Sequence, residues 1–395
     1  MQSIGDKLRD SKGVGNGFDA LRLLLAIGVV AWHANAVVRG GLPLEHMNFV
    51  WMPGYAILSI FFALSGFLIA GSAQRLRLPD FLLNRGLRIF PALAVEIILS
   101  AFILGLALTT LSAADYLSDR QTWHYLTNIV ALINYKLPGV FKSNPSDVVN
   151  GSLWTVPLEF LCYAVMSVIM LASMLRRPMT ILAMIVAIVV IGLGAQFLFP
   201  SLADNAATAL LPKIFERVFT AHQSRLLLSF LWGIFIFCMK DKIPYSRWLA
   251  LLAVLVCTVL ACFGPAVNLG YPVVNAIAVP ALAYLMAFFG VSNVPTPSIF
   301  KKGDYSYGIY LYGYPMQQVM VSAFPGVHSA LLQFFLALPV IALFSVFSWH
   351  VIEKPILKLR KHFSFMSKVR LAEEATPKAE VTTADGALSP STNRH

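Results

Sequence analysis

Ten long apolar runs recur along this chain of 395 residues, and they constrain the fold more than any other feature. Each is long enough, or nearly long enough, to cross a hydrocarbon core as a helix, which takes about 20 residues. Only 12% of the residues are charged and 58% are hydrophobic, so a water-soluble globular domain is excluded. We therefore expect an all-α polytopic membrane protein with about ten transmembrane helices. The runs cover residues 18–38, 51–73, 89–111, 152–175, 179–199, 223–239, 248–264, 272–291, 305–324 and 329–352.

The distribution of lysine and arginine predicts the orientation of these helices. An even number of spans leaves both termini on one side, and placing them in the cytoplasm puts 23 of the 30 basic residues there. This bias agrees with the excess of positive charge in cytoplasmic loops. We expect a cytoplasmic leader at 1–17, a transmembrane domain at 18–357 and a basic, then disordered, cytoplasmic tail at 358–395. The expected location is the cell inner membrane.

Two connecting segments are expected on the outer side. Segment 112–151 lies outside at both ends, and its middle, 123–134, is apolar but too short to cross the bilayer. We expect an interfacial or re-entrant helix there. A second outer segment, 200–222, is expected to form the rim of an outward-facing cavity together with the first.

The cysteines and the net charge exclude two classes of partner. All four cysteines lie inside apolar runs without the spacing of metal ligands, which argues against a disulfide framework and against a metal site. The net charge of +11 resides in loops between spans, where it follows membrane orientation, so nucleic acid is not an expected partner. The cysteines are Cys162, Cys238, Cys257 and Cys262.

The first apolar run carries an arginine and a histidine on one helical face. Arg22 and His33 are eleven residues apart, which is close to three turns of helix and a rise of roughly 16 Å. With Arg22 near one boundary, His33 lies near the midplane of the membrane. Ionisable groups at that depth usually face a protein interior or a wet cavity. This spacing suggests chemistry reached from both sides of the membrane.

Two arginines and one glutamate extend this pattern. Arg85 and Arg88 share a face near the start of the third span, at the expected level of Arg22, so three guanidinium groups can form a phosphate site. Ordinary positive-inside topology explains the same residues equally well. Glu159 follows the outer boundary by ~12 Å of helix and shares the expected depth of His33. It is either a functional partner or a protonated group in a helix–helix hydrogen bond.

Three further features have ordinary structural interpretations. Small residues in the string FFALSGFLIAG favour close helix packing over a substrate contact. The tyrosines and glutamines of 305–324 fit either a polar cavity wall or an interfacial belt. Glu353, Lys354 and His350 are interpreted as a charge cluster that orients the last span.

Together these strings resemble the acyltransferase-3 family of integral-membrane O-acyltransferases, over Asp19 to Pro355. The resemblance implies transfer of an acyl group, often acetyl, from cytoplasmic acyl-CoA to a hydroxyl group of a glycan or another acceptor. It also implies that His33 is catalytic and that three arginines, Arg22, Arg85 and Arg88, contact acyl-CoA. This chain has Gly313 where the family commonly has a histidine. The strings are Arg22 with His33 after Asp-x-Leu, FFALSGFLI, NRGLRIFP, LWTVPLEF, GDYSYGIYLYGYP and VIEKP.

The leading hypothesis is a membrane-only O-acetyltransferase that uses acetyl-CoA, needs no metal and modifies exopolysaccharide, O-antigen or a lipid-linked saccharide. His33 acts as general base and Glu159 orients the imidazole or the acceptor. The substrate-site candidates are Trp154, Thr155 and Tyr305. A proton-coupled carrier or flippase, with a relay of Arg22, His33 and Glu159, is the alternative. A structural or sensory subunit is a third reading, and a homo-oligomer stays open.

Overall fold

The computed structural model describes residues 2–11, 15, 17–41, 51–198, 215–267, 269–294 and 303–363. Within these ranges the chain is helical and forms no sheet, apart from two isolated β-bridges. Seven helical stretches are long and apolar enough to cross a membrane. This confirms an all-α, multi-pass membrane protein. The stretches are Gly17–Arg39, Trp51–Ala73, Leu78–Leu108, Gly151–Leu171, Pro178–Gln196, Tyr271–Val291 and Ala330–Leu359.

All ten apolar runs of the sequence coincide with helices. The first half contains α1 (Ile4–Asp10), α2 (Gly17–Arg39), α3 (Trp51–Ala73), α4 (Leu78–Leu99), the π-helix η2 (Ser100–Leu104), α5 (Gly105–Leu108), α6 (Ala113–Ser118), α7 (Arg120–Tyr125), the 3₁₀-helices η3 (Leu126–Val130), η4 (Gly151–Thr155) and η5 (Met174–Arg176), α8 (Val156–Leu171) and α9 (Pro178–Leu198). The second half contains the π-helix η7 (Glu216–Thr220), α11 (Ser224–Cys238), α12 (Arg247–Val267), α13 (Tyr271–Val291), α14 (Ser306–Ala323), α15 (Ala330–Phe347), the π-helix η9 (Ser348–Glu353) and α16 (Lys354–Phe363). Three of these helices, α11, α12 and α14, are not among the seven that are long and apolar enough to cross a membrane.

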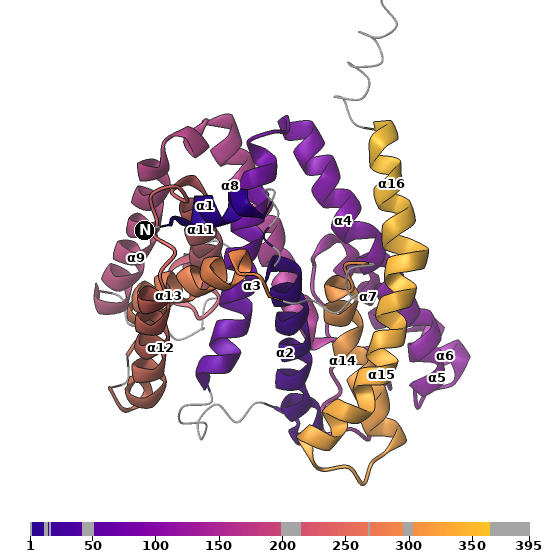
Figure 1. The fold of residues 1–395 in the computed structure, drawn as a ribbon. Helices are drawn as coiled ribbons and strands as arrows, with labels where there is room; N and C mark the ends of the chain where they lie inside the picture. The colour runs from indigo at the N-terminus through magenta and orange to yellow at the C-terminus, as the bar shows by residue number, and fades with distance from the viewer. Residues whose placement is uncertain are drawn as a thin grey trace, which may run out of the picture.

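The long helices pack side by side, with α9, α12 and α13 on one flank and α15 and α16 on the other (Figure 1). Large apolar side chains cover the outer faces, for example Trp248 on α12 and Leu331 on α15, which are 68% and 67% exposed. In water such a surface is unfavourable, whereas hydrocarbon accepts it. The outer surface therefore suits a lipid environment.

Helices α3 and α11 approach each other so closely that only glycine fits at two positions of the contact. A Cβ atom on Gly66 would lie 2.0 Å from the carbonyl oxygen of Phe230, and one on Gly233 would lie 2.0 Å from that of Ala63. Glycine at these crossings lets the two backbones touch. The packing interpretation of the small residues in FFALSGFLIAG is thus confirmed at Gly66, while Ser65 lines a cavity described below.

The N-terminal leader folds back onto the connection between α11 and α12. The amide of Ile4 donates to the carbonyl of Ile243 at 2.9 Å, and Arg9 pairs with Asp241 at 2.6 Å. A capping box of Ser3 and Asp6 starts α1. The leader and this connection therefore lie on the same side of the protein.

The segment between α5 and α8 begins with the short helices α6, α7 and η3 and continues without a helix from 131 to 150. The interfacial or re-entrant position of these short helices stays a prediction. Some apolar residues of the segment are exposed, for example Leu132 at 63%, whereas others, such as Tyr125 and Val140, are fully buried. Its far end is held against α14, because Asn144 donates to the side chain of Gln318 at 2.9 Å. The second predicted outer segment, 200–222, lies outside the described residues up to 214, and so does the predicted tail from 364 onward.

Candidate functional site

A cavity of about 130 Å³ lies between α2, α3, α4, α8 and α14. Three arginines line it, Arg22 from α2 and Arg85 with Arg88 from α4. The helical spacing of Arg85 and Arg88 turns both toward the same neighbours. The structure therefore brings together the three guanidinium groups that the sequence singles out.

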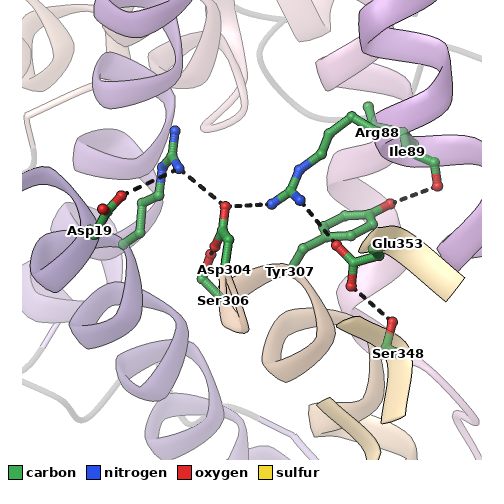
Figure 2. Close-up of polar contacts among 9 residues, drawn as sticks. Asp19, Arg88, Ile89, Asp304, Ser306, Tyr307, Ser348 and Glu353 are labelled. Atoms are coloured by element: carbon green, nitrogen blue, oxygen red, sulfur yellow. Dashed lines mark hydrogen bonds and ion pairs between the residues drawn. The ribbon is translucent and has the colours of Figure 1, made fainter. Parts of the chain in front are cut away.

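A carboxylate that sequence reasoning missed joins two of these arginines. Asp304, two residues before α14, accepts from Arg22 Nη1 at 3.1 Å and from Arg88 Nη2 at 2.6 Å through the same oxygen, Oδ2 (Figure 2). Arg88 also pairs through Nη1 with Glu353 Oε2 at 3.1 Å. Glu353 is only 2% exposed and accepts from Ser348, so it is the buried end of a partly buried ion-pair chain and not an orienting charge at the boundary.

The environment of Asp304 keeps its carboxylate charged. Burial raises the pKa of Asp304, but the positive charges of Arg88 and Arg22 and the hydrogen bonds from Ser306 lower it more, to about 2. The group is therefore ionised at neutral pH. It compensates the charge of two arginines even when nothing else is bound.

Arg85 differs from the other two arginines. Within the described part of the chain it forms no ion pair, and its Nε atom is buried without a hydrogen-bond partner. Glu159 lines the same cavity and accepts from the Tyr163 hydroxyl at 2.5 Å. Arg85 thus has N–H groups without a partner, which can donate hydrogen bonds to a bound anion.

A second, larger cavity of about 600 Å³ contains His33. Its wall is largely aromatic, and two further basic side chains, His222 and Arg225, line it. The His33 ring lies edge-on to the ring of Tyr314, with centroids 5.1 Å apart. The imidazole therefore faces a cavity inside the protein, as its expected depth in the membrane requires. The aromatic lining residues are Trp32, Trp51, Tyr55, Trp154, Tyr271 and Tyr310.

The two cavities adjoin at Leu58 and Tyr310, because both residues line both cavities. The Tyr310 hydroxyl lies 2.5 Å from Thr155 Oγ1 and 3.0 Å from the carbonyl oxygen of Ser152. A polar group thus stands at the boundary between the arginines and His33.

The remaining predicted site residues are distributed unevenly. Trp154 lines the His33 cavity and Thr155 lines the arginine cavity. Glu159 lies with the arginines and does not line the His33 cavity. Tyr305 lines neither cavity, and its hydroxyl lies 3.2 Å from His350 Nε2. Gly313 packs toward α2, where an added Cβ would lie 2.9 Å from Val30 Cγ2.

Sequence reasoning missed Asp304, Tyr310, His222 and Arg225. Asp304 and Tyr310 belong to the string GDYSYGIYLYGYP, but nothing in the string says which of its side chains reach a cavity. Arg225 contributed only to the count of basic residues. Among the described residues, no group of three or more His, Cys, Asp or Glu side chains forms a metal site.

Two of the comparisons with known proteins name acyl transfer. The sequence model of a family described as an acyltransferase domain matches residues 16–350. An O-acetyl transferase of Shigella phage Sf6 is 27% identical over 355 residues, which are 87% of this chain and 96% of that protein. Nodulation protein 10 of Rhizobium leguminosarum bv. viciae is 28% identical over 378 residues, 90% of this chain and 97% of that protein. A search of solved structures gives no significant match.

Proposed function

The chain belongs to this acyltransferase family, and from that premise we propose that it moves an acetyl group from cytoplasmic acetyl-CoA to a hydroxyl group of a glycan at the membrane. Family membership identifies an enzyme that transfers acyl groups, so the carrier and the structural subunit are no longer the better explanations. The name of the phage relative supports O-acetyl transfer in particular.

The observation that carries the proposal is the pair of adjoining cavities, one lined by arginines and one by His33. We assign the CoA phosphates to Arg22, Arg85 and Arg88, since guanidinium groups bind phosphate through paired hydrogen bonds. The acyl end of the donor then passes Leu58 and Tyr310 to reach the level of His33. The glycan hydroxyl enters the His33 cavity from the outer side.

In the proposed reaction, neutral His33 accepts the proton of the glycan hydroxyl group while the oxygen of that hydroxyl attacks the thioester carbonyl carbon. The carbon–sulfur bond then breaks, and CoA leaves as a thiol with the proton that the imidazole returns. Because Glu159 lies with the arginines, we assign it to positioning on the donor side instead of a direct contact with His33. We assign the hydroxyl groups of Thr155 and Tyr310, which lie 2.5 Å apart, as candidate donors to the thioester oxygen.

The proposed topology places ten spans in the inner membrane with both termini in the cytoplasm. The three-arginine cavity is then the inner one, because Arg22 lies near the start of the first span and Arg88 directly precedes the third apolar run, 89–111. The donor and the acceptor can therefore approach from opposite sides.

The first test is His33→Ala in membranes supplied with radiolabelled acetyl-CoA and with saccharides from source cells that lack this protein. We expect label transfer to fall by about 10² to 10⁴. His328→Ala is a matched control, because His328 is exposed and lies outside both cavities. Acetylation at the wild-type rate by the His33 variant would remove the proposed role of the imidazole.

A further inference from the structure

The His33 cavity contains a cation that the transfer reaction described above does not use. Arg225 lies at the start of α11 and is only 6% exposed. Its guanidinium group stacks over the ring of Tyr55, 4.9 Å from the centroid, and Nη1 donates to the carbonyl oxygen of His222 at 2.6 Å. The charged end is therefore held in place at the cavity wall.

No counter-charge accompanies this cation in the described part of the chain. No described carboxylate lies within 4.0 Å of it, and the described residues that line the cavity include no acid. The buried Nε atom has no hydrogen-bond partner. A buried cation without a counter-charge is unfavourable, so its position at a cavity wall favours an anionic ligand.

Hydrogen bonds also hold the tyrosine ring on which the guanidinium group stacks. The Tyr55 hydroxyl donates to Asn275 Oδ1 at 2.6 Å, and Asn275 donates to Ser224 Oγ at 2.8 Å. This chain joins α3, α13 and α11 and locks the ring on which Arg225 rests. A preorganised cation loses less entropy when it binds an anion.

The rest of the wall suits a sugar ring. The His222 ring lies 5.8 Å from that of Trp154 and 5.9 Å from that of Tyr271, so flat aromatic faces adjoin the cation. Aromatic side chains offer apolar faces with polar edges, which match the faces and hydroxyl groups of a saccharide. The cavity thus combines a surface for a ring, a cation and His33.

We propose that Arg225 binds an anionic group of the acceptor, so that the enzyme acts on acidic glycans. The group is a carboxylate or a phosphate attached to the saccharide, and both present oxygens that accept paired hydrogen bonds from arginine. This inference rests on the proposed function, since it assigns the acceptor to the His33 cavity. It adds the chemical class of the acceptor, which the transfer reaction itself leaves open.

A binding experiment without acetyl-CoA tests the inference. The purified full-length protein is titrated with a neutral tetrasaccharide, with its uronate-containing counterpart and with the neutral sugar carrying a reducing-end phosphate. Tryptophan fluorescence reports binding, because three of the seven tryptophans line the cavity. We expect at least one acidic probe to bind about 10- to 100-fold more tightly than the neutral one. The preferred acidic probe shows whether the anion is a sugar carboxylate or a phosphate.

Two variants locate the effect. Arg225→Gln should remove the preference for the acidic probe, and Arg225→Lys should keep part of it because the charge remains. Arg217→Gln is the matched control, since Arg217 is an exposed cation on η7 that does not line the cavity. A full preference in Arg225→Gln overturns the inference.

The wild-type protein alone also tests the anion site, even if Arg225→Gln does not fold. Equal affinity of the wild type for all three probes overturns the inference. A failure of the proposed function looks different, because label transfer is then absent while the preference for an acidic probe persists. Transfer to neutral and acidic glycans with equal acceptor KM would instead retain the enzyme and reject the anion site.

Discussion

Asp304 accepts hydrogen bonds from arginines on two different helices, so one carboxylate holds α2 and α4 against the start of α14. Two of the three cavity arginines are thereby paired before any ligand binds. Arg85 forms no ion pair with any described residue and makes its positive charge available to an incoming phosphate. The three arginines are therefore unequal, although the sequence presents them as one set.

We predict that Arg85→Gln raises the donor KM by about tenfold and changes kcat little, because it removes a ground-state contact with phosphate. Arg88→Gln should raise the donor KM and also lower the melting temperature, since it leaves Asp304 and Glu353 without their shared partner. Initial rates at varied acetyl-CoA, together with thermal unfolding in detergent, separate the two effects.

The control for these variants is Arg77→Gln. Arg77 is exposed at the N-cap of α4, close in sequence to both arginines, and it does not line the cavity. Its replacement should leave both the donor KM and the melting temperature unchanged. A donor KM for Arg85→Gln equal to that of the wild type would contradict the phosphate site.

At the scale of helices, the sequence predicts the elements well and their partners poorly. Hydropathy and length suffice to place a helix on each apolar run. The boundaries move where a polar first turn precedes the apolar part: α4 begins at Leu78, eleven residues before the expected start of its run. Proline at the first turn favours that earlier start.

The contacts between helices depend on residues far apart in the chain. The pairing of Arg22 with Asp304 spans 282 positions, and Tyr55 meets Asn275 across 220 positions. Hydropathy carries no signal for such pairs. Helical spacing predicted the faces of Arg22 and His33, but the cavity that each face meets, and the place of Glu159 beside the arginines, follow only from packing.

Helices α3 and α11, which cross at Gly66 and Gly233, both line the His33 cavity, α3 through Tyr55 and α11 through Arg225. We predict that Gly66→Ala destabilises the protein by about 1–3 kcal/mol, since the added methyl group meets the backbone of Phe230, which cannot rotate away. Gly194→Ala on α9 is the control, because a Cβ there meets nothing within 4 Å. It should be neutral or stabilising by up to about 1 kcal/mol. Equal melting temperatures of the two variants would show that the helices can separate at no cost.

For the whole molecule, the proposed ten crossings predict which helix ends share a side of the membrane, and the contacts between helix ends can be compared with that prediction. The leader pairs with the connection after α11. The first turns of α2 meet the segment before α14, and the middle of α4 meets the end of η9. At the opposite ends, the segment before α8 bonds to the far part of α14 through Asn144. Strict alternation of ten spans places every contact of the first group inside and the last one outside.

Single-cysteine labelling tests this topology directly. The four native cysteines are replaced first, and one cysteine is then introduced at Arg77 or at Arg120, both of which are exposed. We expect a membrane-impermeant maleimide to label Arg120→Cys in intact spheroplasts and to label Arg77→Cys only after permeabilisation. In the proposed topology Arg120 begins the short helix α7 on the outer side, and Arg77 caps α4 on the inner side. Labelling of Arg77→Cys from outside would show that the protein has the opposite orientation in the membrane. The arginine cavity would then face away from cytoplasmic acetyl-CoA, and the proposed direction of transfer could not hold.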